Sequence, residues 1–315
     1  MERLRPSRSK GYSLLRGIGI PLLAGSLVVA GGWVLGQQRG EERLPQGEGA
    51  SWVAAALTPE TIQSVFLAPE ELRQGNLILT EGTVPVASPD SLTQVEMPEN
   101  GTYQLGGEEL YLDEDCLRAF QGMMEEYVAA TGNNQLLLSD GYRSISAQSR
   151  LAEIGGEGCR QDPPGTSEHH TGLALDLAQM TVDGPVPFTG EGVQGWIAEN
   201  GPAYGFITRY PAGKEEITGH PAQADHLRYV GIPHGQVMEE LGLCLEEYWS
   251  AMEGYTVDHP YRTATPDGFT WQIYYVPAQE TGTQIQVPKN SWWEVSGDNQ
   301  AGFLITVRDT LTDQA

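Results

Sequence analysis

Residues 165–176 read GTSEHHTGLALD, a loop with two histidines that leads into a predicted strand. Leucines alternate with Ala174, Asp176 and Ala178, so the strand carries Asp176 on a face of small side chains, where a metal and a substrate fit. Another histidine lies in residues 225–231, DHLRYVG, a second predicted strand. Two histidines and a carboxylate on one sheet face are a donor set for zinc, which takes about three protein ligands in catalytic sites. A metal-free carboxylate–histidine hydrogen bond is the alternative that this spacing leaves open.

The apolar periodicity around this segment predicts an α+β protein. Apolar residues three to four positions apart predict a helix over residues 116–130, and weaker helix patterns occur at 58–73, 146–154, 193–200 and 234–252. Short apolar runs predict strands at 77–79, 135–139, 173–177 and 226–230. We therefore expect a small mixed or antiparallel sheet with helices around the candidate metal site.

The composition changes after Met252. Four short segments rich in β-branched and aromatic residues, most of them separated by glycine or proline, predict strands at 270–276, 283–287, 292–295 and 303–307. This pattern is typical of a small all-β domain. We expect such a domain at residues 253–315, packed on a main domain at residues 58–252.

The N-terminus has the pattern of a membrane segment. Residues 1–17 hold five basic residues and one acidic residue, and residues 18–36 hold no charge. A helix over the uncharged run is about 28 Å long, close to the thickness of the hydrocarbon core. The basic flank predicts a cytoplasmic N-terminus and an exported body, joined by a polar stalk at 37–57. A signal peptide cleaved after residues 28–30 and a buried core helix are the alternatives.

Charge and cysteine content narrow the function classes. The formal net charge is −24; residues 1–50 contribute +3, from seven basic and four acidic residues, and residues 51–315 contribute −27, from eleven and thirty-eight. An acidic body excludes nucleic-acid binding, because neutralising phosphates requires clustered lysine and arginine. Two arrangements are open for the three cysteines: one disulfide with a spare thiol, or three buried thiols. The cysteines are Cys116, Cys159 and Cys244.

Four motifs in order resemble one enzyme family. They are SDGYRS at 139–144, SEHHTGLALD at 167–176, GFITRYP at 205–211 followed by Lys214 and Thr218-Gly219, and HLRYVG at 226–231. Together they resemble the zinc D-Ala-D-Ala carboxypeptidases and dipeptidases of the family typified by VanY. The resemblance covers roughly residues 75–250, so the N-terminal segment and the predicted β domain fall outside it.

The resemblance implies a role for each motif residue. His169, Asp176 and His226 would bind Zn²⁺, and Arg143 would steady the scissile carbonyl or a substrate carboxylate, which suits a fixed guanidinium. Ser167 and Tyr142 would bind the substrate. Arg209 and Arg228 are expected to form structural ion pairs, and His170 to support the loop. The remaining histidines carry no motif and are expected at the surface or in packing: His220, His234 and His259.

The sequence departs from the family pattern at the residue that transfers protons. The family places a glutamate three residues before its last histidine, and Gln223 stands there, with Ala224 and Asp225 replacing a proline and a tryptophan. A glutamine amide cannot act as a general base near neutral pH. The base then comes from elsewhere, from Asp225, Glu215 or Glu216, or the chain is a weak or inactive homologue.

The resemblance also implies a substrate. An active enzyme would remove terminal D-Ala from peptidoglycan stem peptides or precursors outside the cytoplasm, with cleavage of the free dipeptide or of another cell-wall peptide as alternatives. An inactive homologue would bind D-Ala-D-Ala ends as a sensor or scaffold.

Overall fold

The computed structural model describes residues 61–80, 85–87, 89, 91–154 and 162–309. The predicted membrane helix at 18–36, its basic flank, the stalk and Cys159 lie outside these ranges. Within them, no helix is both long enough and apolar enough to cross a membrane. Cys116 and Cys244 are buried free thiols.

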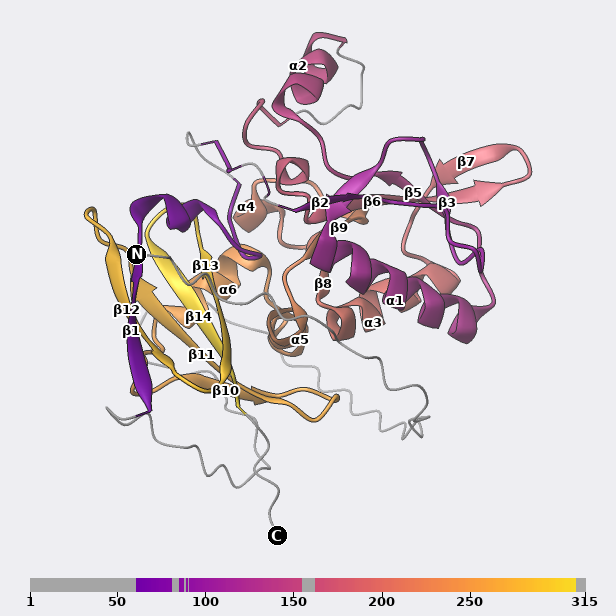
Figure 1. The fold of residues 1–315 in the computed structure, drawn as a ribbon. Coiled ribbons are helices and arrows are strands. Elements are labelled where there is room, and N and C mark those ends of the chain that lie inside the picture. Colours follow the sequence, from indigo (N-terminus) through magenta and orange to yellow (C-terminus); the bar gives the residue numbers. More distant parts are fainter. Residues whose placement is uncertain (1–60, 81–84, 88, 90, 155–161, 310–315) are drawn as a thin grey trace. The chain divides into compact units, whose positions relative to one another are not determined.

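A mixed sheet forms the centre of the fold, as predicted (Figure 1). Its strands run in the order β3 (Gln104–Leu105), β5 (Leu136–Asp140), β6 (Ala174–Thr181), β9 (Gln223–Tyr229) and β8 (Phe206–Tyr210). The strand β7 (Gly184–Pro187) forms a hairpin with β6. The β3–β5 pair is parallel, and the other pairs in this sheet are antiparallel. Beside the sheet, β2 (Leu92–Gln94) pairs with β4 (Tyr111–Asp113).

The predicted helix at 116–130 is confirmed as α1 (Glu114–Thr131). It begins at Asp113, whose carboxylate accepts a hydrogen bond from the backbone N–H of Asp115, and it ends at Gly132 in a left-handed conformation. Its apolar face packs on the leucines of β5 and β6, and burying each such side chain stabilises the fold by about 1.5–3 kcal/mol. The main contacts come from Phe120, Met123, Met124, Tyr127, Leu136, Leu138, Leu175 and Leu177.

The shorter helices follow the predicted pattern with one correction. They are α2 (Ile145–Ile154), α3 (Gly195–Asn200), α4 (Glu215–Thr218), α5 (Ile232–Leu241) and α6 (Leu245–Met252). The single helix predicted at 234–252 is wrong, because Gly242 has φ 64° and its left-handed backbone ends α5. Single 3-10 turns lie at η1 (Pro69–Arg73), η2 (Glu168–Thr171), η3 (Gly192–Gln194) and η4 (Gly201–Tyr204).

The four predicted C-terminal strands are confirmed, and an additional strand was not predicted. The sheet order is β10 (Tyr261–Ala264), β11 (Thr270–Pro277), β14 (Gly302–Asp309) and β13 (Trp292–Gly297), and β12 (Thr283–Pro288) pairs with β1 (Ile62–Leu67). The helix predicted at 58–73 is therefore wrong over Ile62–Leu67. These residues form a strand because pairing with β12 buries Leu67 in the C-terminal core.

The strand predicted at 77–79 is also wrong. Leu77, Ile78 and Leu79 are buried but form no strand. Instead, the N–H of Leu77 donates to Ser296 Oγ (2.9 Å) and that of Leu79 to the Asp298 carbonyl (3.3 Å). The segment thus connects the two sheets, and Figure 1 shows α5 and α6 between them as well.

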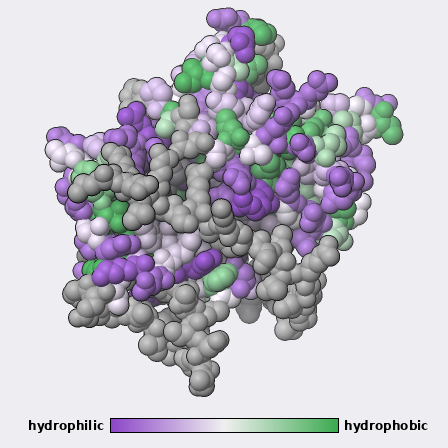
Figure 2. Space-filling model, viewed as in Figure 1, coloured by the Kyte–Doolittle hydropathy of each residue, from purple (hydrophilic) through white to green (hydrophobic). Residues whose placement is uncertain are grey.

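Exposed hydrophobic side chains on the face shown in Figure 2 lie in small groups among hydrophilic ones. Val182 and Val186 are exposed on the β6–β7 hairpin, and Ile154 at the end of α2. Scattered apolar residues of this kind are ordinary on protein surfaces.

Gly205, between η4 and β8, allows a close approach of two backbone segments. It has φ 81°, and an added Cβ would lie 2.7 Å from the carbonyl carbon of Gly231 and 2.9 Å from the backbone nitrogen of Ile232. We expect Gly205→Ala to lower the free energy of unfolding by about 2–5 kcal/mol, through left-handed strain and overpacking. Gly213→Ala is the matched control, because Gly213 has φ 86° and nothing within 4 Å, so it should cost only about 1–2 kcal/mol. Urea unfolding measures both values, and an equal loss of unfolding free energy in the two variants would contradict the steric argument.

Candidate metal centre

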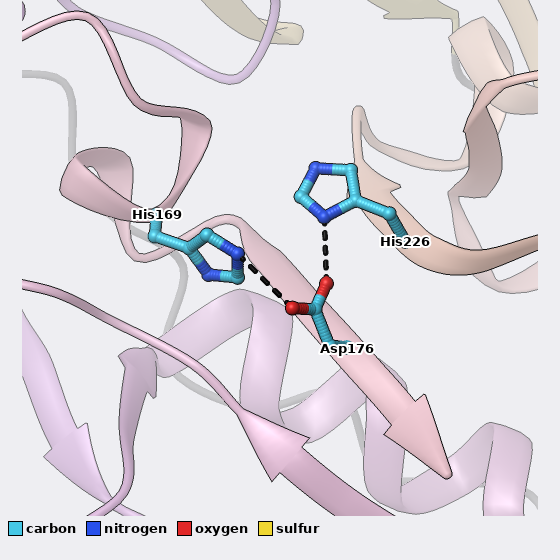
Figure 3. Close-up of side chains that lie close together, drawn as sticks. All are labelled: His169, Asp176 and His226. Carbon is cyan, nitrogen blue, oxygen red and sulfur yellow. Dashed lines mark hydrogen bonds and ion pairs between the residues drawn. The ribbon is translucent and has the colours of Figure 1, made fainter. Parts of the chain in front are cut away.

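Three side chains meet where β6, β9 and η2 come together (Figure 3). Asp176 and His226 are directly paired in the register of β6 and β9, and His169 lies in the turn before β6. Asp176 Oδ1 lies 2.7 Å from His226 Nδ1, and Asp176 Oδ2 lies 3.4 Å from His169 Nε2. One ligand atom from each residue lies within 4.8 Å of the others, so the predicted set is brought together.

The surroundings orient these groups as ligands. His169 Nδ1 donates to the Gly141 carbonyl at 2.7 Å, which leaves the Nε2 lone pair directed at Asp176. Burial would lower the pKa of His169, but Asp176 outweighs burial and raises it. Burial would raise the pKa of Asp176, but the two histidines hold it well below its usual range. Two imidazole nitrogens and an ionised carboxylate that converge in this way fit zinc.

Arg143 lies next to this cluster and is held in place. Its backbone N–H donates to the His169 carbonyl at 3.1 Å. Its guanidinium forms an ion pair with Asp140 and donates to Gln148 Oε1 at 2.6 Å. A guanidinium fixed on two sides is suited to bind a carboxylate or carbonyl oxygen.

The two residues expected to bind substrate differ in their surroundings. Ser167 is buried, and its Oγ has no hydrogen-bond partner among the described residues. Tyr142 is half-buried, and its backbone N–H donates to the Tyr111 carbonyl at 2.7 Å. Ser167, two residues before His169, therefore offers a buried hydroxyl group that can still form a hydrogen bond.

A bulge in β9 includes Asp225. Leu227 pairs with Thr208 and Gln223 pairs with Tyr210, so the three residues Ala224–His226 lie opposite one residue of β8. Ala224 packs against the main core, whereas burial and then the negative charge of Asp176 raise the pKa of Asp225.

The other carboxylates weighed as the base are placed less favourably. Glu215 and Glu216 are exposed on α4. Gln223 is half-buried at the first position of β9. Of the three acidic candidates, Asp225 is the half-buried one, and it directly precedes His226.

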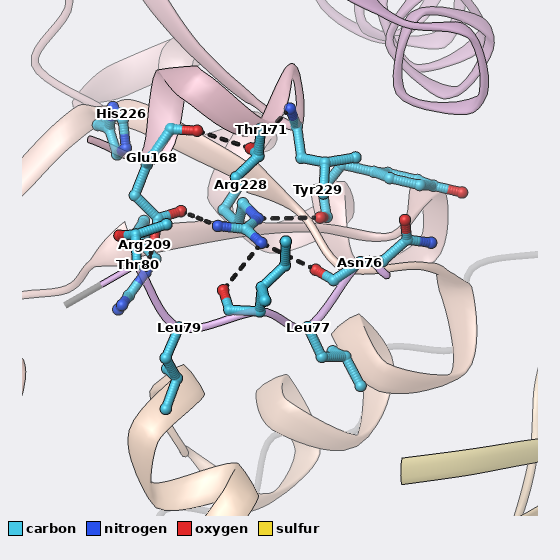
Figure 4. Close-up of polar contacts among 12 residues, drawn as sticks. Asn76, Leu77, Leu79, Thr80, Glu168, Thr171, Arg209, His226, Arg228 and Tyr229 are labelled. Carbon is cyan, nitrogen blue, oxygen red and sulfur yellow. Dashed lines mark hydrogen bonds and ion pairs between the residues drawn. The ribbon is translucent and has the colours of Figure 1, made fainter. Parts of the chain in front are cut away.

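The expected structural ion pairs of Arg209 and Arg228 are confirmed, and their shared partner was not predicted (Figure 4). Both guanidiniums bind Glu168, and all three side chains are buried. Burial would raise the pKa of Glu168, but Arg228 and Arg209 outweigh burial and lower it to about 2. The sequence signal was a glutamate between two site residues, Ser167 and His169, which periodicity does not single out.

The remaining histidines support the structure. His170 Nδ1 donates to the Arg143 carbonyl at 2.5 Å, and Nε2 accepts from the Gly165 N–H at 3.0 Å, so the ring supports the loop as expected. His234 has a packing role. Its ring is buried, with Nδ1 2.7 Å from Tyr248 Oη and Nε2 3.0 Å from Thr306 Oγ1. The His220 ring stacks on Tyr210 with centroids 4.3 Å apart.

Comparisons with known proteins identify the family of this chain. The family model described as VanY, D-alanyl-D-alanine carboxypeptidase, matches residues 109–232. A D-alanyl-D-alanine carboxypeptidase of Enterococcus faecium is 34% identical over 258 residues, which cover 79% of this chain and 80% of that protein. The chain belongs to the VanY family of D-alanyl-D-alanine carboxypeptidases.

Further VanY-family relatives include bifunctional enzymes. A bifunctional D-Ala-D-Ala dipeptidase and carboxypeptidase of Enterococcus gallinarum, VanXYC, is 39% identical over 136 residues, covering 39% of this chain and 72% of that protein. The crystal structure of the D,D-dipeptidase VanXYg with a D-Ala-D-Ala phosphinate analogue has a TM-score of 0.68 at 30% identity, and covers 79% of this chain and 99% of that one. These relatives place the chain among carboxypeptidases.

Proposed function

We propose that this protein is a zinc D,D-carboxypeptidase that removes terminal D-Ala from peptidoglycan stem peptides. The observation that carries the proposal is the convergence of His169, Asp176 and His226 beside Arg143, in a member of the VanY family. When bound, zinc would polarise the scissile carbonyl and acidify a water molecule. Other divalent metals also fit this donor set, so metal identity is part of the test.

The side chains around the donors supply substrate binding. The Arg143 guanidinium would bind the terminal carboxylate or the scissile carbonyl oxygen, for which its donors are fixed by Asp140 and Gln148. Ser167 Oγ would donate to the peptide, which gives this buried hydroxyl a partner. Tyr142 would contact the substrate from the same segment as Arg143.

Asp225 would replace the family's glutamate as the proton-transfer group. It would take a proton from the attacking water and pass it to the leaving amine. Two observations support this assignment: Asp225 lies in the β9 bulge directly before His226, and burial followed by the negative charge of Asp176 raises the pKa of its carboxyl group. Gln223 would then act only as a hydrogen-bonding group.

A binding protein for D-Ala-D-Ala ends is the second candidate, and Gln223 favours it. If Asp225 does not transfer protons, the ligand set and Arg143 remain, and the chain would hold stem-peptide ends as a sensor or scaffold. Cleavage of free D-Ala-D-Ala is a further alternative within the enzyme class, since the relatives VanXYg and VanXYC are named as dipeptidases.

Export of the chain, which the N-terminal sequence predicts, would suit a cell-wall substrate. The uncharged run at residues 18–36 after a basic flank would anchor the chain in the cell membrane, with the catalytic domain outside the cytoplasm. Stem peptides and their precursors would then be in reach, whereas a cytoplasmic dipeptide would not.

The test is D-alanine release by the purified full-length protein from a stem pentapeptide ending in D-Ala-D-Ala, and from the free dipeptide. We expect release from the pentapeptide with zinc, and loss of release with a chelator or in the His169→Ala variant. Binding of the pentapeptide without release would favour the second candidate. Release only from the dipeptide would overturn the substrate assignment.

A further inference from the structure

The Glu168 carboxylate binds side chains from three other segments, among them the strand that carries His226 (Figure 4). Its Oε1 accepts from Arg209 Nε at 2.9 Å and from Thr80 Oγ1 at 3.3 Å, and its Oε2 accepts from Arg228 Nη1. Glu168 and both arginines are fully buried. A buried charge network of this kind has discrete geometry, because each oxygen is bound from a fixed direction.

Two partners of Glu168 lie on strands that carry or contact His226. Glu168 itself directly precedes His169. Arg228 follows His226 by two residues and therefore projects from the same face of β9. Arg209 precedes Tyr210, whose ring is stacked on that of His226 with centroids 5.3 Å apart. One carboxylate thus links η2 to both strands that position His226.

The same network reaches the C-terminal sheet through the segment 76–80. Arg228 Nη2 donates to the carbonyls of Asn76 and Ile78, each at 3.1 Å. Ser296 and Asp298 in turn accept the N–H groups of Leu77 and Leu79. The C-terminal sheet therefore supports the segment against which Arg228 is fixed.

We propose that Glu168 is a positioning residue, which sets the separation of His169 and His226 and thereby the zinc affinity of the site, with the C-terminal sheet as the outer support of this network. The inference rests on the proposed function in that it takes the three donors to be zinc ligands. Residues that orient metal ligands from behind typically change metal affinity 10–100-fold when they are replaced.

The experiment compares zinc dissociation constants of metal-stripped full-length variants, by competition with a chromophoric chelator. Glu168→Gln removes the charge, and Glu168→Asp keeps the charge but shortens the side chain. Glu246→Gln is the matched control, because Glu246 also binds Arg209 (2.6 Å) but lies on α6, which carries no proposed ligand. We expect affinity to fall about tenfold or more in Glu168→Gln and several-fold in Glu168→Asp, with Glu246→Gln within about twofold of the wild type.

Two further readouts separate positioning from simple stabilisation. The absorption spectrum of bound Co²⁺ should change in both Glu168 variants, because it reports ligand geometry, and the unfolding of the metal-free proteins shows how much stability each change costs. If Glu168→Gln does not fold, the zinc affinity and the Co²⁺ spectrum of Glu168→Asp still test the inference. If the folded Glu168 variants keep the zinc affinity of the wild type and an unchanged Co²⁺ spectrum, the positioning role of Glu168 is overturned, and the proposed metal site is not. Failure of the wild type to bind zinc would overturn it together with the metal site.

Discussion

Replacing Asp225 with asparagine is expected to lower kcat for D-alanine release about 10²–10⁴-fold, the usual contribution of a general acid–base group. Asparagine has nearly the same shape but cannot accept the proton. Zinc affinity should stay within about twofold, because Asp225 is not one of the three converging donors. Steady-state kinetics and a zinc titration on the same preparation check both expectations.

Gln223→Glu in the Asp225→Asn background is the matched control, since it returns a carboxylate to the position where the family has one. Recovery of activity in this double variant would show that the ligand set and Arg143 are competent and lack only a base. Full activity in Asp225→Asn alone would exclude Asp225 as the base. An inactive wild type that becomes active on Gln223→Glu would establish the binding protein instead of the enzyme.

Replacing Asp176 with alanine is expected to abolish stoichiometric zinc binding and to lower kcat/KM about 10³-fold or more. The carboxylate lies between the two imidazoles, 2.7 Å from His226 Nδ1 and 3.4 Å from His169 Nε2, so its loss leaves two neutral donors. Loss of several kcal/mol of charge stabilisation corresponds to a rate change of that size. Metal content after dialysis and D-alanine release measure the two effects.

Asp183→Ala is the control for that variant, because Asp183 is an exposed aspartate at the turn between β6 and β7 and should change neither property. Metal-dependent activity that survives in Asp176→Ala would contradict the ligand assignment. Loss of zinc with unchanged activity would show that hydrolysis proceeds without the proposed centre.

Local patterns in the sequence were sufficient for the helix at 116–130 and for the central strands at 135–139, 173–177 and 226–230, but not for β3, β7 and β8 of the same sheet. The apolar spacing that predicts α1 and the alternation around Asp176 that predicts β6 are both local patterns, and the structure has a helix and a strand at these places. The donor set was predictable because the motifs that contain His169, Asp176 and His226 resemble those of the VanY family, whereas spacing alone left a metal-free carboxylate–histidine pair open. The three side chains meet because β6 pairs with the strand that carries His226.

Long-range contacts explain two of the mispredicted elements. Ile62–Leu67 is a strand because it pairs with Thr283–Pro288, more than two hundred residues later, and no pattern within the segment reveals that partner. In the same way, residues 77–79 are buried without strand pairing because Ser296 Oγ of β13 and the Asp298 carbonyl accept the N–H groups of Leu77 and Leu79.

The sequence by itself determined the family motifs, the ligand set and the substitution at Gln223, because these are matters of residue identity and order. Only the tertiary structure revealed the bulge that includes Asp225 and the buried ion pairs of Glu168. The bulge in β9 depends on pairing with β8, and the Glu168 network joins side chains from four separate segments. Neither follows from local periodicity, because buried ion pairs and strand register are set by the packing of the whole chain.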